Sequence, residues 1–508
     1  MAGGTPRARR GPRSARRTRP GGAARGLRAG LALLTVLGLV GLGLLPTSLA
    51  AFSATTSNSA SSFTARTTFG LIQTAPCFSH DGSGGCTSAT GIAAGRSAVV
   101  SPDGRHVYVA TTYSPDSARS GVAEFSRNAT TGALTQLAGP DRCVSNGALS
   151  GCTAIPGALS GVQDVAISPD GRHVYAAAST GSTVAALSRN ASTGVLTALA
   201  GPNTCVYHSA ATAVTGCTSA RVLDGASGVA VSPDGEFVYV ASSRSDSVTV
   251  FARDDATGAL TQLAGTAGCI TNSAVGGCVT GRGLNQPGYL RLSPDGSSVY
   301  VASSTSRAVA VFQRNPTTGV LTQAGTPNAC VYDSGASAIT GCTAVRGLSG
   351  VKNVAIAPDG RTVYTMAVSG DAVAAFTRNT GTGVLTQLAA PDACVYRSGA
   401  TAITGCTAVT GLDGPTAMTF SADGLFAFVS MSTYNAVLAF RLNTTTGALA
   451  QLAGTAGCLR LSGTGSCAAG LGLSLANYVT TSPDGRDVYA VGGNANSTGF
   501  VVPLNLAH

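Results

Sequence analysis

The sequence predicts an all-β protein, a seven-bladed β-propeller, and two observations carry that prediction. A turn sequence typified by SPDG at Ser101–Gly104 occurs in seven copies, 61 to 67 residues apart. Short alternating or apolar segments flank every copy, and no segment of the repeats has the periodicity of a helix. Seven copies of a four-stranded antiparallel unit are typical of a propeller that closes into a ring.

The seven copies share the chemistry of a type I turn. Proline presets φ at the second position, aspartate suits the third, and glycine relieves the fourth. Only Ala422 departs from this pattern, since it replaces the proline. The copies are Ser101–Gly104, Ser168–Gly171, Ser232–Gly235, Ser293–Gly296, Ala357–Gly360, Ser421–Gly424 and Ser482–Gly485.

Each repeat offers four strands. An apolar inner strand such as Asp164–Ile167 precedes the turn, and an alternating strand such as Phe237–Ala241 follows it. A third strand and a turn ending in Thr and Gly lead to a fourth, outer strand. The C-terminal segment Tyr478–Leu506 supplies only three strands, so the N-terminal strand Phe69–Gln73 is expected to complete the last blade. Such closure removes exposed sheet edges.

An aromatic residue follows each turn glycine by four positions, and we expect this row to pack between blades. A ring of ligand-stacking aromatics is the less favoured alternative. The turn aspartates are expected to act in the turns alone. His106 and His173 are expected at the surface, whereas His80 and His208, in the cysteine loops, are better candidates for chemistry. The aromatic row is Tyr108, Tyr175, Tyr239, Tyr300, Tyr364, Phe428 and Tyr489.

The first 50 residues predict an export signal. They hold nine arginines and no acidic residue, followed by an apolar run, Leu31–Leu45, and small residues up to Ala50. The run is shorter than the roughly 20 residues of a membrane span, which favours cleavage after Ala50 over an uncleaved anchor. Residues 51–66 are then a Ser/Thr-rich spacer, and 67–508 the propeller.

The remaining chain has 23 basic and 22 acidic residues, because nine of the 32 basic residues lie in the leader. This balance argues against nucleic acid as a partner. A membrane is expected as a partner only if the leader is not cleaved.

Fourteen cysteines fall two to a repeat, always in the connection between an outer strand and the next inner strand. Their spacing of 9 or 12 residues exceeds that of metal-ligand pairs, so seven local disulfides and no metal site are expected. The predicted pairs are Cys77 and Cys86, Cys143 and Cys152, Cys205 and Cys217, Cys269 and Cys278, Cys330 and Cys342, Cys394 and Cys406, and Cys458 and Cys467.

Strand direction places these cysteine loops around one end of the central channel, and the SPDG turns at the other. Rigid loops around a concavity favour a ligand site, so the cysteine-loop face is the predicted functional face. The alternative is that the polar residues of this face only contact water in a water-filled channel and bind no ligand. The candidate ligand-binding residues lie five or four positions before the turns: Arg96, Gln163, Asp164, Tyr289, Lys352, Asn353, Asn477 and Tyr478.

The segment PDGRHVYVA and its copies resemble the YVTN-type repeat of seven-bladed lactonase propellers, over residues 67–508. The resemblance implies ring opening of a sugar lactone or a similar cyclic ester by acidic, Arg and His groups in the channel. The chain has only two glutamates, Glu124 and Glu236, and neither is expected at the cysteine-loop face. If the protein is a hydrolase, Asp164 would activate water, and Arg96 and Lys352 would stabilise the oxyanion.

Two functions follow as hypotheses. The first is an exported binding module that takes a small molecule, a saccharide or a protein at the cysteine-loop face. The alternative is an extracytoplasmic lactonase-like hydrolase. The sequence has no coenzyme-binding motif, so no cofactor is expected.

Overall fold

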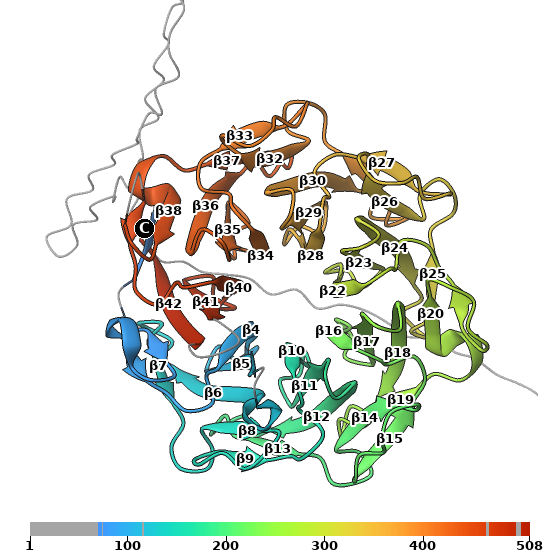
Figure 1. The fold of residues 1–508 in the computed structure, drawn as a ribbon, viewed down its shortest axis with the longest axis vertical. Coiled ribbons are helices and arrows are strands. Elements are labelled where there is room, and N and C mark those ends of the chain that lie inside the picture. The colour runs from blue at the N-terminus through green and yellow to red at the C-terminus, as the bar shows by residue number, and fades with distance from the viewer. Residues whose placement is uncertain (1–69, 74, 114–115, 464–466, 494–498, 508) are drawn as a thin grey trace, which may run out of the picture. The chain divides into compact units, whose positions relative to one another are not determined.

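A computed structural model describes residues 70–507 apart from 74, 114–115, 464–466 and 494–498, and in this range seven sheets form a ring around a channel (Figure 1). The predicted seven-bladed β-propeller is therefore confirmed. The expected signal peptide and spacer lie outside the described residues. Among the described residues, no helix has the length and apolar character needed to span a membrane.

Each blade runs outward from an inner strand that lines the channel. In blades 1 to 3 the strands are β4 (Ala94–Val100), β5 (His106–Thr112), β6 (Gly121–Arg127), β7 (Leu134–Gln136), β8 (Cys143–Ser145) and β9 (Thr153–Ala154); β10 (Val162–Ile167), β11 (His173–Ala178), β12 (Thr183–Arg189), β13 (Leu196–Ala198), β14 (Cys205–His208) and β15 (Cys217–Ala220); and β16 (Ala226–Val231), β17 (Phe237–Ser242), β18 (Ser247–Arg253), β19 (Leu260–Gln262), β20 (Cys269–Thr271) and β21 (Val279–Thr280).

Blades 4 to 6 repeat the pattern. Their strands are β22 (Pro287–Leu292), β23 (Ser298–Ser303), β24 (Ala308–Arg314), β25 (Leu321–Gln323), β26 (Cys330–Asp333) and β27 (Thr343–Val345); β28 (Val351–Ile356), β29 (Thr362–Ala367), β30 (Ala372–Arg378), β31 (Leu385–Gln387), β32 (Cys394–Arg397) and β33 (Thr407–Val409); and β34 (Pro415–Phe420), β35 (Phe426–Met431), β36 (Ala436–Leu442), β37 (Leu449–Gln451), β38 (Cys458–Arg460) and β39 (Ala468–Ala469).

Blade 7 joins the two ends of the described chain. Its strands are β40 (Ala476–Thr481), β41 (Asp487–Gly493) and β42 (Gly499–Ala507) from one end, and β1 (Gly70–Ile72), β2 (Phe78–Ser79) and β3 (Thr87–Ser88) from the other. Strands β1 and β2 both pair antiparallel with β42, so the N-terminal segment closes the ring as expected.

The outer part of each blade is more divided than the four-strand pattern suggests. In blade 2, β13 and β14 pair antiparallel with opposite halves of β12, so together they form the fourth strand. A short edge strand, β15, then pairs in parallel with β14. Its register sets Cys205 opposite Cys217, and the disulfide links these two residues.

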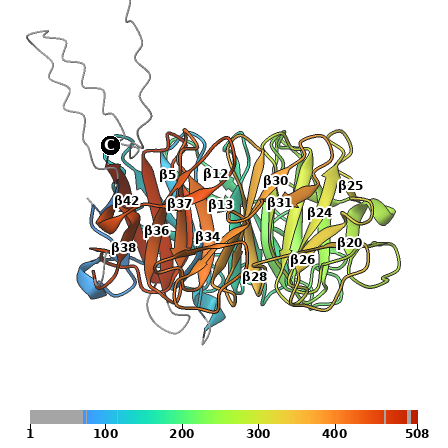
Figure 2. The same ribbon diagram turned by 90° about the horizontal axis from the view of Figure 1, so that it is seen from above.

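All seven predicted disulfides form, each between the two cysteines of one repeat. Figure 2 shows the blades from the side, with connecting loops on two opposite faces. The cysteine loops also contain or adjoin short 3-10 turns, η1 (Ser83–Gly85), η3 (Gly265–Gly268) and η4 (Gly454–Gly457), whereas η2 (Ser117–Arg119) lies between β5 and β6.

The SPDG turns fold as their chemistry predicts. The Gly104 amide donates to the Ser101 carbonyl at 2.8 Å, and Gly104 has φ of 69°. The Ser101 hydroxyl donates to Asp103 at 2.5 Å, which fixes the carboxylate in the turn.

The turn aspartates also act between blades, which the sequence did not predict. The second oxygen of Asp103 accepts from Arg189 of blade 2 at 2.7 Å, and the same guanidinium donates to the Tyr108 hydroxyl at 2.8 Å. Tyr108 in turn donates to the Gly194 carbonyl of blade 2 at 2.7 Å. We call this set of an aspartate, a tyrosine and an arginine an inter-blade clasp.

Corresponding Arg–Asp and Arg–Tyr contacts join four other pairs of blades, through Arg127, Arg253, Arg314 and Arg378. The six tyrosines of the row are fully buried, so their predicted packing between blades is confirmed. Two junctions lack the clasp arginine. Blades 5 and 6 keep Tyr364 but have Leu442 in place of the arginine, and blades 6 and 7 have Phe428 and Leu506 in one apolar cluster.

Candidate functional site

Every inner strand carries a β-bulge at the same repeat position. The pairing of β10 with β11 shifts between Val162 and Asp164, and six other inner strands shift at the equivalent place. A bulge re-aims the side chain at the irregular position. The seven bulge residues include four of the predicted ligand-binding residues, Arg96, Gln163, Lys352 and Asn477, and the others are Ser227, Gly288 and Thr416.

Several bulge residues bind neighbouring backbone. Ser227 donates to the Pro287 carbonyl at 2.8 Å, Thr416 to Ala476 at 3.1 Å, and Asn477 to Gly95 at 3.1 Å, so these three tie adjacent blades together. Gln163 donates to the Gly161 carbonyl of its own blade at 3.3 Å. Arg96 and Lys352 are the two charged residues of the row.

A layer of large side chains fills the middle of the channel. Tyr289 extends from β22 towards blades 1 and 2, where its hydroxyl lies 3.3 Å from the Arg96 carbonyl and 3.4 Å from that of Gln163. The Tyr478 ring lies 6.2 Å from the Tyr289 ring, and the Arg291 guanidinium lies 5.5 and 5.9 Å from the two rings. We call these three side chains the tyrosine layer. They separate two hollows.

Beside this layer, Asp164 is buried with four polar partners. One carboxylate oxygen accepts from the Ser97 hydroxyl at 2.6 Å and from the Val165 amide at 3.0 Å. The other accepts from the Val229 amide at 3.1 Å and lies 3.6 Å from the Arg291 guanidinium. Burial raises the pKa of Asp164, and Arg291 and the hydrogen bonds oppose that rise. The net shift of the Asp164 pKa is upward, so burial favours the protonated carboxyl more than in an exposed aspartate.

The Arg291 guanidinium connects this carboxylate to the channel. It donates to the Tyr478 hydroxyl at 2.7 Å, and 24% of its side chain is exposed, compared with 2% for Asp164. Ser97, besides its bond to Asp164, also interacts with the Tyr478 hydroxyl. Burial raises the pKa of Tyr478, so its hydroxyl stays protonated at neutral pH.

One hollow lies between the tyrosine layer and the SPDG turns, and we call it the SPDG-end hollow. Its volume is about 380 Å³, and Arg291, Tyr478 and Thr480 are among its polar lining residues. The rest of its wall is largely aliphatic and comes from the last residues of the inner strands, including Val99, Ile167, Val231, Leu292 and Ile356. Asp164 and Arg291 therefore lie towards the SPDG end of the channel, opposite the predicted functional face.

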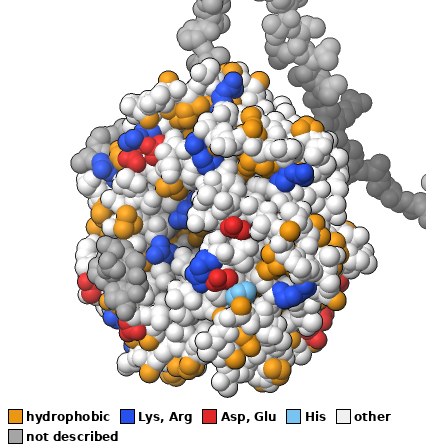
Figure 3. All heavy atoms as spheres, turned by 45° about the vertical axis from the view of Figure 1, so that its right-hand side comes forward, with side chains coloured by type: hydrophobic (Ala, Val, Ile, Leu, Met, Phe, Trp, Pro, Cys, Tyr) orange, Lys and Arg blue, Asp and Glu red, His pale blue; other side chains and the backbone are white. Residues whose placement is uncertain are grey.

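The second hollow lies at the cysteine-loop face, and we call it the cysteine-end hollow. It has a volume of about 500 Å³ and is lined by Lys352, Arg244 and the hydroxyls of Ser243, Ser304 and Ser432. Burial and the positive charge of Arg96 lower the pKa of Lys352 to about 8. Figure 3 shows basic side chains spread over one face of the molecule, several of them beside acidic ones.

The predicted site residues thus fall into separate groups. Arg96 and Lys352 are close enough to repel one another, but the cation 3.6 Å from Asp164 is Arg291. Asn353 is buried, and its oxygen accepts from the Val354 amide at 2.9 Å, which gives it a role in the backbone. Tyr289 and Tyr478 belong to the tyrosine layer.

Sequence reasoning missed Arg291 and Ser97. A signal for Arg291 was present, because two positions before the turn serine the other repeats carry small or uncharged residues, Val99, Ala166, Ala230, Ala355, Thr419 and Thr480. Ser97 had no such signal, since a buried serine is recognised only by its partner across the blade boundary.

The expected surface placement of His106 and His173 was wrong. Each is 4% exposed, and its Nδ1 lies 2.7 or 2.8 Å from a clasp arginine, Arg189 or Arg253. The two histidines are buried because they lie between blades, where burial lowers their pKa. On the cysteine-loop face, Nε2 of His80 lies 2.7 Å from Arg119, and His208 accepts from the Leu223 amide at 3.3 Å.

These blades and hollows define a β-propeller with two hollows along its central channel. Residues 166–334 match the family described as lactonase, 7-bladed beta-propeller. The described chain is a seven-bladed β-propeller, and this match over part of the chain agrees with the resemblance that the repeat implied. No curated protein sequence matches it.

Solved structures of gluconolactonases are among those similar to this chain. The periplasmic gluconolactonase of Pseudomonas aeruginosa is 18% identical, with a TM-score of 0.50, and the match covers 80% of this chain and 99% of that one. A proposed 6-phosphogluconolactonase of Bacteroides uniformis is 19% identical, with a TM-score of 0.47, over 70% and 82% of the two chains. At these identities the likeness concerns the fold.

Proposed function

We propose that the protein is a lactonase-like hydrolase that opens a cyclic ester in the SPDG-end hollow. The observation that carries the proposal is the buried Asp164 carboxylate held 3.6 Å from Arg291 inside the channel of a lactonase-type propeller. A carboxylate with a raised pKa beside a cation is the pairing that general base catalysis and oxyanion stabilisation require. Binding of a partner at the cysteine loops has no such support and stays a prediction.

The mechanism assigns a role to each polar group of the cluster. The lactone carbonyl accepts a hydrogen bond from Arg291, which lines the hollow. Water attacks the carbonyl carbon. Its proton passes through the Tyr478 hydroxyl, which also lines the hollow, and then through the buried Ser97 to Asp164, to which the Ser97 hydroxyl is bonded at 2.6 Å. The tetrahedral intermediate then breaks the ring C–O bond, and the proton returns from Asp164 to the leaving alkoxide.

The wall of the hollow limits the ring that fits. Its aliphatic residues offer no hydrogen-bond partners to the hydroxyls of a sugar lactone, whose burial there would be costly. An alkyl substituent would instead bury apolar surface against Val231 and Ile356. We therefore expect alkyl-substituted lactones to be better substrates than polyhydroxylated ones.

The test is hydrolysis of a lactone panel by the purified mature protein and by Asp164→Asn and Arg291→Met. Loss of a positioned general base costs about 10²- to 10⁴-fold, so kcat should fall by that factor in Asp164→Asn. The matched control is Glu236→Gln, which changes an exposed carboxylate beside an SPDG turn. The proposal fails if no lactone is turned over, or if Asp164→Asn retains the wild-type rate in a folded protein.

An extracytoplasmic location is part of the proposal. Seven disulfides persist only in an oxidising compartment in most cells, and the similar gluconolactonase of Pseudomonas aeruginosa is periplasmic. Fractionation of expressing cells, with N-terminal sequencing of the product, tests it. A reduced protein that keeps its first residues in the cytoplasm would contradict it.

A further inference from the structure

The cysteine-end hollow contains positive charge that no acidic residue balances. Lys352 lines this hollow, and in the described part of the chain its amine has neither an ion pair nor a hydrogen bond. Arg96 does not line the hollow but lies near Lys352, and its Nε is buried and has no hydrogen-bond partner among the described residues. Both side chains come from bulge positions, and their charges repel one another.

The acidic residues on the turns around this hollow already have partners. Asp224 pairs with Arg244 at 2.7 Å, and Asp371 pairs with Arg397 at 2.8 Å. Asp246 accepts from the Gln286 amide at 2.8 Å. These carboxylates therefore bind groups of the surrounding loops and do not neutralise Lys352 or Arg96.

We propose that the cysteine-end hollow is a binding site for the carboxylate or phosphate group of a small anion, with Lys352 and Arg96 as its cations. Both side chains are partly buried, an unpaired charge is costly in such surroundings, and an anion that joins the two charges reduces that cost. Ammonium and guanidinium donors are also the usual protein partners of both kinds of oxyanion. The site is independent of the proposed hydrolysis, because the tyrosine layer lies between the two hollows.

The site has a chemical handle, since Lys352 is the single lysine of the chain. Amine acylation followed by peptide mass spectrometry therefore reports on Lys352 alone, apart from the N-terminal amine, which maps to another peptide. A bound anion should hide the amine and favour its unreactive charged form. At ten times the Kd, labelling of Lys352 should slow by about tenfold.

The probes are sodium phosphate and sodium acetate, each compared with sodium chloride at equal ionic strength. Protection by phosphate alone or by acetate alone identifies the class of anion. Arg96→Met, which keeps an apolar stem but removes the charge, should weaken the protection, whereas the exposed Arg361→Met should not. Equal labelling in phosphate, acetate and chloride, or full protection in folded Arg96→Met, would overturn the proposal.

A second measurement does not depend on the labelling chemistry. The protecting anion should raise the Tm of the wild-type protein, because it binds the native state, and should not raise that of Lys352→Met. Lys352→Met should fold at least as stably as the wild type without added anion, since it removes a partly buried charge that has no partner. A similar anion-dependent rise in Tm for both proteins would place the anion elsewhere and refute the site.

Discussion

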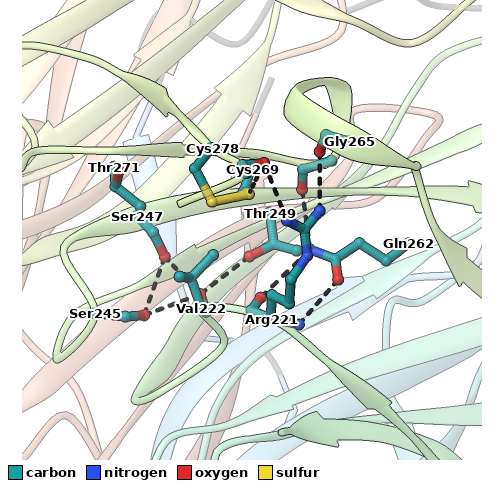
Figure 4. The surroundings of a disulfide bond; sticks show 12 residues. Arg221, Val222, Ser245, Ser247, Thr249, Gln262, Gly265, Cys269, Thr271 and Cys278 are labelled. Carbon is teal, nitrogen blue, oxygen red and sulfur yellow. Dashed lines mark hydrogen bonds between the residues drawn. A yellow bond between two sulfur atoms is a disulfide. The ribbon is translucent and has the colours of Figure 1, made fainter. Parts of the chain in front are cut away.

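Val222 occupies a backbone position that favours glycine. It has φ of 48°, and the six other repeats carry glycine there with φ between 69° and 81°. Its carbonyl accepts from the hydroxyls of Ser245, Ser247 and Thr249, at 2.9, 2.6 and 3.1 Å (Figure 4). These three bonds hold a left-handed conformation that a β-branched residue rarely adopts.

Val222→Gly should therefore stabilise the protein by about 1 kcal/mol, because the relief of strain exceeds the entropy cost of glycine. Chemical denaturation checks this value. The converse change, Gly347→Val, should destabilise, because a Cβ at Gly347 lies 3.2 Å from the sulfur of Cys394. Lower stability of Val222→Gly would show that the valine side chain contributes more by packing than the strain costs.

Glu124 is 1% exposed, and its carboxylate accepts from the Leu196 amide at 2.8 Å. Burial raises its pKa to about 9 from 4.5. The folded protein therefore holds the proton at pH 7 and the unfolded chain does not, so stability falls as the pH rises from the unfolded pKa towards 9. At about 1.4 kcal/mol per pH unit, the loss by pH 7 is about 3 kcal/mol.

Glu124→Gln removes this titration. The variant should match the wild type near pH 4 and exceed its free energy of unfolding increasingly up to pH 9, as denaturant titrations at a series of pH values would measure. The exposed Glu236→Gln is the control and should leave the pH profile unchanged. Parallel profiles for the wild type and Glu124→Gln would mean that Glu124 is ionised in the folded protein.

Among elements, the inter-blade clasps depend on pairs of residues from different repeats. Where blades 6 and 7 meet, phenylalanine replaces the clasp tyrosine and Leu506 lies in place of the arginine, so both polar groups are lost together. Where blades 5 and 6 meet, only the arginine is replaced, by Leu442, and the buried Tyr364 hydroxyl keeps its bond to the Gly447 carbonyl at 2.7 Å. The chain thus contains a natural single variant and a natural double variant of its own clasp.

A double-mutant cycle on Arg189 and Tyr108 tests this account. Arg189→Met should destabilise by about 3 kcal/mol, since it leaves Asp103 and Tyr108 without their charged partner. The change Tyr108→Phe should cost about 1 kcal/mol. The double variant should cost less than the sum, with a coupling of about 0.5 to 3 kcal/mol. Additive costs would show that the two groups act independently.

A glutamine near the end of the fourth strand shows which elements the sequence could predict. In six blades it bonds the backbone of the preceding cysteine loop, as Gln262 accepts from the Arg221 amide at 2.9 Å. In blade 2 the position is Ala198, and its partner in the loop is Pro156, which has no amide to donate. The turns and strands were predictable because their signals are local, but this pairing joins residues about 41 positions apart.

For the whole molecule, the ring and its disulfides were predictable because the same sequence pattern occurs in every repeat. The candidate site was predictable only in part. Its bulge row emerged from the repeat, but Asp164 meets residues of blades 1, 3 and 4, and no local pattern indicates which blades face each other across the channel. Because of that geometry, the partner of Asp164 is Arg291 and not Arg96, which the sequence had suggested.

Ring closure gives blade 7 a property that the other blades lack. Strands β1 to β3 and β42 come from opposite ends of the described chain, so their pairing, such as Phe78 with Val501, is held without a connecting loop. The disulfide Cys77–Cys86 fixes β2 beside β3 within this closing segment. Loss of this disulfide should therefore loosen the closure as well as release loop entropy.

Replacing Cys77 and Cys86 by serine should cost about 2.7 kcal/mol from loop entropy alone. The matched control replaces Cys269 and Cys278, which also lie 9 residues apart, but in blade 3. Amide hydrogen exchange should accelerate along β42 in the first variant, because β1 and β2 can then detach from it. In the control it should accelerate only in β20 and β21, since both flanks of that segment stay joined to the ring. Equal protection of β42 in the two variants would mean that strand pairing and the apolar contacts of Leu71 close the ring without help from the disulfide.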